Sequence, residues 1–414
     1  MSTYFAEGLP FSIVHQISGQ FFTALGASLP QIGLTALYGL AWNLKFVWSP
    51  LVDRFGTTRR WLVGTEIALA LLVFAIAWPA SHGDLSSVAR MLVAVAFLAA
   101  THDIAVDGFY LRALGTRQQT ALSGLRIAAY RAAVLVGNGL LVWLAGRTSW
   151  FWCFVAAGGL LLLLAIGHAA FLPSEGTEST NSRAKGARSA HRDPPAPAGS
   201  PSEANDSNAR AARSAGDRER LTLAVFTSFF EKPRAAVILG FILTFRAGDA
   251  MMFAMATPLL KDLGMDTAHR GVIGGVGTCA SIVGSIGGSA LITRFSLRRT
   301  LLPIALIQSL AILLYALLAW TRPAVIGIGA VVVVEQLVAG VGTAAFLVFI
   351  VRRSAGKHQV SHFAITSALM SVATTLAGSA SGYLASLVGF TVFFGIAFAA
   401  SIPGVILART VPTD

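Results

Sequence analysis

The stretch MLVAVAFLAATHDIAVDGFYLRAL (residues 91–114) opens with ten apolar residues and then carries two aspartates, Asp103 and Asp107. Their four-residue spacing places both carboxylates on one face of a helix. In a soluble protein such a face is solvated, whereas in a bilayer a carboxylate is costly and has to face protein or water. The environment of this helix therefore decides the fold of the chain.

Composition identifies that environment as a membrane. Of the 414 residues, 55% are hydrophobic and 12% are charged, against roughly 25% charged residues in ordinary soluble domains. Many apolar stretches reach the length of about 20 residues that a helix needs to cross a bilayer. The sequence predicts an all-α polytopic membrane protein with twelve transmembrane helices. Their approximate ranges are residues 4–26, 31–52, 61–80, 88–112, 120–145, 151–172, 234–260, 270–292, 300–320, 324–351, 361–387 and 389–409.

The basic residues between these spans are distributed unevenly. Four short loops on one side hold eleven of them, and five loops on the other side hold five. An excess of Lys and Arg marks the cytoplasmic side, so we expect both termini to be cytoplasmic. The net charge of +12 is then a topology signal, and we expect no nucleic-acid partner. The richer set is Arg54, Arg59, Arg60, Arg112, Arg117, Arg294, Arg298, Arg299, Arg352, Arg353 and Lys357; the poorer set is Arg90, Arg147, Lys261, Arg270 and Arg322.

A polar linker divides the chain into two halves. Between Pro173 and Arg220 there is no Val, Ile, Leu, Met or aromatic residue, so this segment cannot bury enough apolar surface to fold. We predict an N-terminal six-helix bundle (1–172), a disordered cytoplasmic linker (173–230) and a C-terminal six-helix bundle (231–414). The apolar spacing of LTLAVFTSFFEKPR (221–234) favours a short interfacial helix at the end of the linker.

The two halves resemble each other weakly. VDRFGTTRR (52–60) follows the second span, and ITRFSLRRT (292–300) follows the eighth. Two pseudo-symmetric six-helix bundles joined by a long central loop are typical of the major facilitator superfamily, which is built from repeats. The sequence therefore predicts a major facilitator fold.

Several charged residues lie deep within the predicted spans, and only on helices that would line a central cavity in such a fold. Such residues are paired or hydrated, so the pattern indicates an aqueous path and favours a transporter. For the four basic residues among them, substrate contact and internal ion pairing are equally open interpretations. They are Lys45, Arg126, Arg131 and Arg246.

The acidic residues suggest two further roles. Asp249 and Glu335 lie far from any loop, and burial in a dry cavity favours the protonated form of a carboxyl group, so we predict that they couple transport to protons. Asp53, Arg54, Asp103 and Asp107 lie near the cytoplasmic ends of the second and fourth spans. We predict that they form a gate in which the aspartates pair with the arginines of the loop at residues 52–60.

The sequence shows no constellation for catalysis or metal binding. His358 and His362 have the spacing of a helical metal pair, but no third ligand lies nearby. Cys153 and Cys279 fall within predicted spans and indicate no disulfide framework. We therefore expect no metal, no cofactor and no enzymatic activity. The other ionisable residues within the spans are Glu7 and His15 in the first, and Glu66 and His168 near the cytoplasmic face in the third and sixth.

Particular strings resemble the muropeptide permease (AmpG) family of the major facilitator superfamily. They are KFVWSPLVDR (45–54), THDIAVDGFYLRAL (101–114), FRAGDAM (245–251), VVVVEQLVAGVGTAAF (331–346) and SHFAITSALMSVATTLAGSASGYLA (361–385). The resemblance implies a proton-driven symporter in the bacterial inner membrane that imports anhydro-muramyl peptides. We expect protons, a small anionic substrate and the lipid bilayer as partners, and a monomeric protein.

Two alternatives stay open. DIAVDG (103–108) also resembles the acetyl-coenzyme A transporters of the wider group, so the substrate could be another organic anion such as an acyl-coenzyme A. The chain could also be a non-transporting sensor on a transporter scaffold, with the linker binding a partner.

Overall fold

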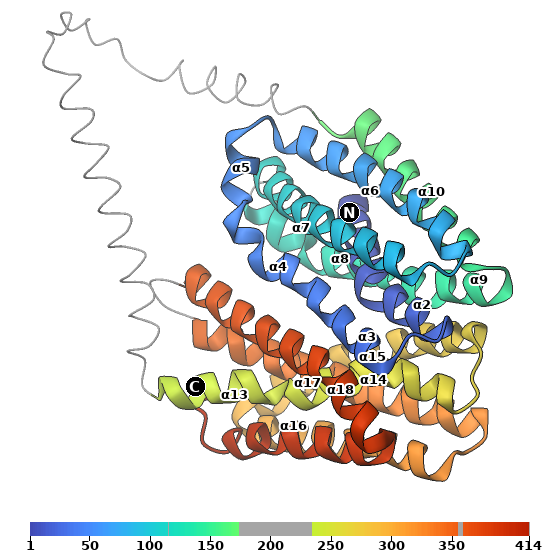
Figure 1. Ribbon diagram of the computed structural model, residues 1–414. Coiled ribbons are helices and arrows are strands. Elements are labelled where there is room, and N and C mark those ends of the chain that lie inside the picture. The colour runs from blue at the N-terminus through green and yellow to red at the C-terminus, as the bar shows by residue number, and fades with distance from the viewer. Residues whose placement is uncertain (115, 174–233, 355–358, 414) are drawn as a thin grey trace, which may run out of the picture.

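The computed structural model describes residues 1–114, 116–173, 234–354 and 359–413, and all regular structure in these ranges is helical (Figure 1). The predicted linker after Pro173 and the predicted interfacial helix lie outside the described residues. The helices form an N-terminal half, coloured blue to green, and a C-terminal half, coloured yellow to red.

The first two predicted spans are interrupted helices. Pro10 lies inside the first one, where it cannot donate a backbone hydrogen bond, and a π-helical turn follows it. The second begins with a capping box, in which Ser28 and Gln31 satisfy each other's backbone N–H groups. The first comprises α1 (Ser2–Ser12), η1 (Ile13–Ile17) and α2 (Ser18–Ala24). The second comprises α3 (Leu29–Leu34), η2 (Thr35–Gly39), α4 (Leu40–Leu44), η3 (Lys45–Val47) and α5 (Ser49–Arg54).

The rest of the N-terminal half consists of longer helices. Thr57 and Asp84 cap the N-termini of α6 and α7 through their side chains. Helix α6 packs against α7 on one face and α10 on another, whereas α1 packs against α7 and α8. The elements are α6 (Thr58–Ser81), α7 (Leu85–Ala113), α8 (Thr116–Leu135), η4 (Val136–Leu141), α9 (Val142–Arg147) and α10 (Trp150–Phe171).

The C-terminal half contains two breaks with clear causes. Arg246 separates α13 from α14, and Gly389 interrupts α18 with φ at 75°, a conformation that glycine adopts without strain. The elements are α13 (Ala235–Phe245), α14 (Ala247–Asp262), α15 (Thr267–Phe295), α16 (Leu297–Thr321), α17 (Val325–Ser354) and α18 (Gln359–Leu407).

Nine helical stretches among the described residues are long and apolar enough to cross a membrane. The first two predicted spans are not among the nine because their helices are short and interrupted, and α18 contains the last two predicted spans as one element. The polytopic helical fold is confirmed. The number of twelve crossings stays a prediction, because the structure contains no membrane.

Phe171 ends α10 and Ala235 begins α13, so these two residues flank the linker. The two halves meet closely at the opposite ends of their helices, which we call the far ends. There, a Cβ on Gly146 would lie 2.2 Å from the backbone N of Ala268, and one on Gly382 would lie 1.9 Å from the backbone O of Leu29. Only glycine permits such approach. Lys261 Nζ also donates to Thr23 O over 2.6 Å. The two halves are therefore closed against each other at the far ends.

Candidate functional site

The aspartates of α7 pair with basic residues from two other helices of the N-terminal half. Asp103 forms an ion pair with Lys45 of η3. Asp107 accepts a hydrogen bond from the hydroxyl of Tyr4 over 2.9 Å and lies 3.1 Å from Arg126 Nη2. The Arg126 guanidinium also lies over the Tyr4 ring, 4.3 Å from its centroid, where the cation is attracted to the π-face. Two of the four predicted basic residues are thus held by internal ion pairs.

Glu7 of α1 joins this cluster. Its side chain lies close enough to those of Asp103 and Asp107 for electrostatic interaction. The cluster then contains three carboxyl groups and two basic side chains.

The predicted pairing of Asp103 and Asp107 with the loop arginines is wrong. Arg54 lies over the Phe55 ring, and Arg59 donates to Ala169 O over 2.6 Å. The physical reason is depth: α7 continues to Ala113, so Asp103 lies about 15 Å from the helix end. At that depth its face meets α1 and η3 instead of the loop. The side chain of Asp53 lies outside the described part of the structure.

The C-terminal half has its own charge cluster on α14, α16 and α17. Asp249 accepts a hydrogen bond from Gln308 Nε2 and lies 4.0 Å from Arg246 Nε. Arg246 also donates from Nη1 to Thr343 Oγ1 over 2.9 Å. The third basic residue predicted from the sequence is therefore also engaged internally, although 28% of its side chain stays exposed.

Glu335 lies fully buried beside this cluster. Its Oε2 accepts hydrogen bonds from Gln336 Nε2 over 3.0 Å and from the Tyr315 hydroxyl over 3.5 Å. It forms no ion pair with the residues that the structure describes, but it is close enough to Asp249 and Arg246 for electrostatic interaction. The two acids predicted to carry protons thus belong to one cluster with one arginine.

Arg131 of α8 differs from the other predicted basic residues. It is half-buried and makes neither a hydrogen bond nor an ion pair with residues of the described ranges.

A group of aromatic rings in the N-terminal half was not predicted from the sequence. Phe11 stacks on His15 with ring centroids 4.2 Å apart, and Trp42 meets both rings edge-on. The ring centroid of Tyr130 lies 5.7 Å from that of Phe11. The Nε2 of His15 points toward Gly39, which in turn lies against Thr375 of the other half. The four-residue spacing of Phe11 and His15 was the available signal, whereas Trp42 and Tyr130 join them only through helix packing.

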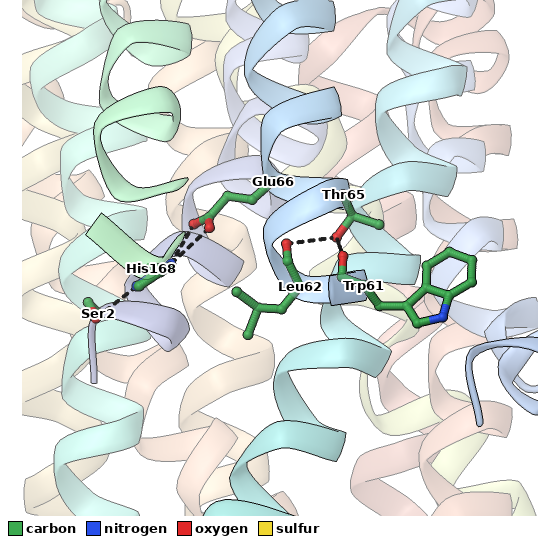
Figure 2. Close-up of polar contacts among 6 residues, drawn as sticks. All are labelled: Ser2, Trp61, Leu62, Thr65, Glu66 and His168. Atoms are coloured by element: carbon green, nitrogen blue, oxygen red, sulfur yellow. Dashed lines mark hydrogen bonds and ion pairs between the residues drawn. The ribbon is translucent and has the colours of Figure 1, made fainter. Parts of the chain in front are cut away.

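A second buried cluster ties three helices of the N-terminal half together. Figure 2 shows His168 of α10 between Glu66 of α6 and Ser2 of α1. The His168 Nδ1 lies 2.8 Å from Glu66 Oε2, and its Nε2 lies 2.9 Å from Ser2 Oγ. One neutral tautomer satisfies both contacts, with Nδ1–H donating to Glu66 and Nε2 accepting from Ser2. The sequence analysis noted both residues near one face but did not pair them.

Comparison with known proteins assigns the chain to a family. A model described as Major Facilitator Superfamily matches residues 1–351. The chain belongs to the Major Facilitator Superfamily. It is 29% identical to the anhydromuropeptide permease of Escherichia coli, over 97% of this chain and 77% of the relative. It is also 22% identical to putative transporter AmpG 4 of Rickettsia felis, over 97% of this chain and 92% of the relative.

Solved structures of major facilitator transporters share the fold. A D-xylose-proton symporter superimposes with a TM-score of 0.71 at 10% identity, covering 100% of this chain and 96% of the other. The nucleoside transporter NupG superimposes with a TM-score of 0.69 at 15% identity, covering 99% and 96%. The predicted major facilitator fold is therefore confirmed, as is the resemblance to the AmpG transporters.

As a major facilitator protein, the chain is a multi-pass membrane transporter of small-molecule substrates and not an enzyme. Its charge clusters suit this role because they lie within helices yet contact solvent. The side chains of Lys45, Asp107 and Arg126 are 34%, 37% and 38% exposed. Water or a polar ligand therefore reaches charged groups deep within the N-terminal half.

Proposed function

We propose that this transporter imports anionic muropeptides across the bacterial inner membrane together with protons, by alternating access. The observation that carries the proposal is the presence of one charge cluster within the helices of each half. The similarity to the anhydromuropeptide permease over 97% of the chain supports the substrate class. With the linker on the cytoplasmic side, closure at the far ends corresponds to a state open to the cytoplasm.

The substrate would be held by charge and by stacking. Arg131 has no internal partner among the described residues, so it is the first candidate for a substrate carboxylate. Lys45, Arg126 and Arg246 exchange their internal carboxylates for those of the substrate. The rings of Phe11, His15 and Trp42 offer an aromatic surface for the apolar face of a sugar ring.

Coupling and gating divide between the two halves in this proposal. Glu335 and Asp249 take up the transported proton, and Arg246 links them to the substrate. Asp103 and Asp107 hold Lys45 and Arg126 until substrate arrives, so they act on the gate from within the N-terminal half, together with Asp53 and Arg54 at the cytoplasmic end of the second predicted span. Both termini and the linker lie in the cytoplasm, and the protein works as a monomer.

Counterflow in proteoliposomes tests the substrate class. Vesicles preloaded with an unlabelled N-acetylglucosaminyl-anhydro-muramyl peptide should take up the labelled compound from outside without any ion gradient. Preloading with an acyl-coenzyme A should not support this uptake. The reverse preference would contradict the muropeptide proposal and favour the other organic anion, and exchange of neither compound would favour a sensor.

A further inference from the structure

The outer face of the C-terminal half contains an apolar groove between α15, α16 and α17. Its cavity volume is about 490 Å³, and its walls include Leu291, Phe295, Ile307, Val338 and Val341. Phe295 and Ile307 are each about half exposed. These apolar walls offer no side-chain hydrogen bonds to a sugar or a peptide.

This groove is separate from the substrate site. Gln308, which follows Ile307 on α16, is buried and donates to Asp249 in the C-terminal charge cluster. Adjacent residues on a helix point about 100° apart, so the groove faces outward while Gln308 faces the cluster. Its walls belong to three of the stretches that are long and apolar enough to cross a membrane, and its half-exposed apolar side chains suit contact with lipid.

Positive charge marks one end of the groove. Arg299 lines it, and Arg298 precedes Arg299 on the exposed surface. Arg294 lies over the ring of Phe295, 5.4 Å from the centroid. Arg299 makes no ion pair or hydrogen bond with the described parts of the chain. From Arg299 to Ile307 the groove runs about 12 Å along α16, away from the loop between α15 and α16.

We propose that this groove binds one anionic phospholipid, with an acyl chain against its apolar walls and the phosphate at Arg299. The ligand has to complement the groove in charge and polarity. It must be apolar along the groove and negatively charged at the end where Arg299 lies. Basic pockets between transmembrane helices are suited to anionic headgroups, and each nearby basic side chain strengthens binding. Free phosphate or an anionic substrate would leave the apolar walls unused.

Native mass spectrometry of the full-length protein in detergent tests the site. After delipidation, the protein is titrated with phosphatidylglycerol or with phosphatidylethanolamine of the same acyl chains. We expect phosphatidylglycerol to bind more tightly. The variant Arg299→Gln should weaken its binding about fivefold, in line with the contribution of one basic residue. The variant Val338→Phe, which fills the groove, should weaken binding of the same lipid.

Arg60→Gln is the matched control, because Arg60 occupies the third position of α6 as Arg299 does in α16, and both are exposed. It should leave lipid binding unchanged. Equal binding of the two lipids, or equal loss in Arg299→Gln and Arg60→Gln, would overturn the proposal. So would binding of glycerol phosphate as tightly as the full lipid. Size-exclusion profiles like that of the wild type show that each variant is folded.

Discussion

Replacing Glu335 by glutamine is expected to leave substrate exchange intact and to abolish accumulation driven by a proton gradient. Glutamine imitates the protonated acid, so it keeps the hydrogen-bonding geometry near Tyr315 and Gln336 but cannot release a proton. The carrier would then cycle with substrate alone. Counterflow and pH-driven uptake, measured on the same proteoliposomes, separate the two activities.

Asp103→Asn is the contrasting variant for this experiment. It removes the ion pair of Lys45 in the N-terminal half, where we place the gate. Exchange and driven uptake should therefore slow by the same factor, and the order of substrate preference should not change. The assignment of coupling to Glu335 is wrong if Glu335→Gln still concentrates substrate under a pH gradient. Loss of accumulation with intact exchange in Asp103→Asn would move the coupling site to the N-terminal half.

Removing the carboxylate of Glu66 should be the most destabilising of the substitutions considered. His168 would lose its hydrogen-bond acceptor inside the protein, and leaving a buried donor unsatisfied costs about 1 to 3 kcal/mol. We expect the free energy of unfolding of Glu66→Ala in mixed micelles to fall by about this amount. Replacing both partners with apolar residues of similar volume, as in Glu66→Leu with His168→Phe, should restore much of the loss.

Thr65→Ala provides the control for this prediction. Thr65 is the neighbour of Glu66 on α6, and its hydroxyl bonds only to Trp61 O and Leu62 O of the same helix (Figure 2). Its loss should cost less than about 1 kcal/mol, because such back-bonding adds little to a helix. If Glu66→Ala were no more destabilising than Thr65→Ala, the pair would not hold α6 and α10 together.

The sequence predicted the helical spans well because apolar length is a local property. The break at Gly389 inside α18 agrees with the predicted division between residues 387 and 389, whereas the π-helical turn after Ser12 was not predicted. The sequence also indicated which charged residues lie within the helices. Each of them could be recognised individually, because ionisable residues are rare within transmembrane segments.

Partners were the part that sequence reasoning missed. Lys45 and Asp103 are 58 residues apart, and Glu66 and His168 are 102 apart, so only the packing of helices brings them together. The loop arginines seemed plausible partners because they are close in sequence to the ends of the spans. The position of Asp103 and Asp107 along α7, rather than their distance in sequence from the arginines, determines which basic residues they pair with.

The most direct test of proton-driven import is net accumulation by the wild-type protein in proteoliposomes. With the membrane potential held at zero and the interior one pH unit more alkaline, one proton per substrate should drive about tenfold accumulation of a labelled anhydro-muramyl peptide, since a factor of ten corresponds to about 1.4 kcal/mol. A protonophore should return the ratio to one. Equilibration at a ratio of one despite the pH gradient, in vesicles that carry out rapid exchange, would contradict proton coupling.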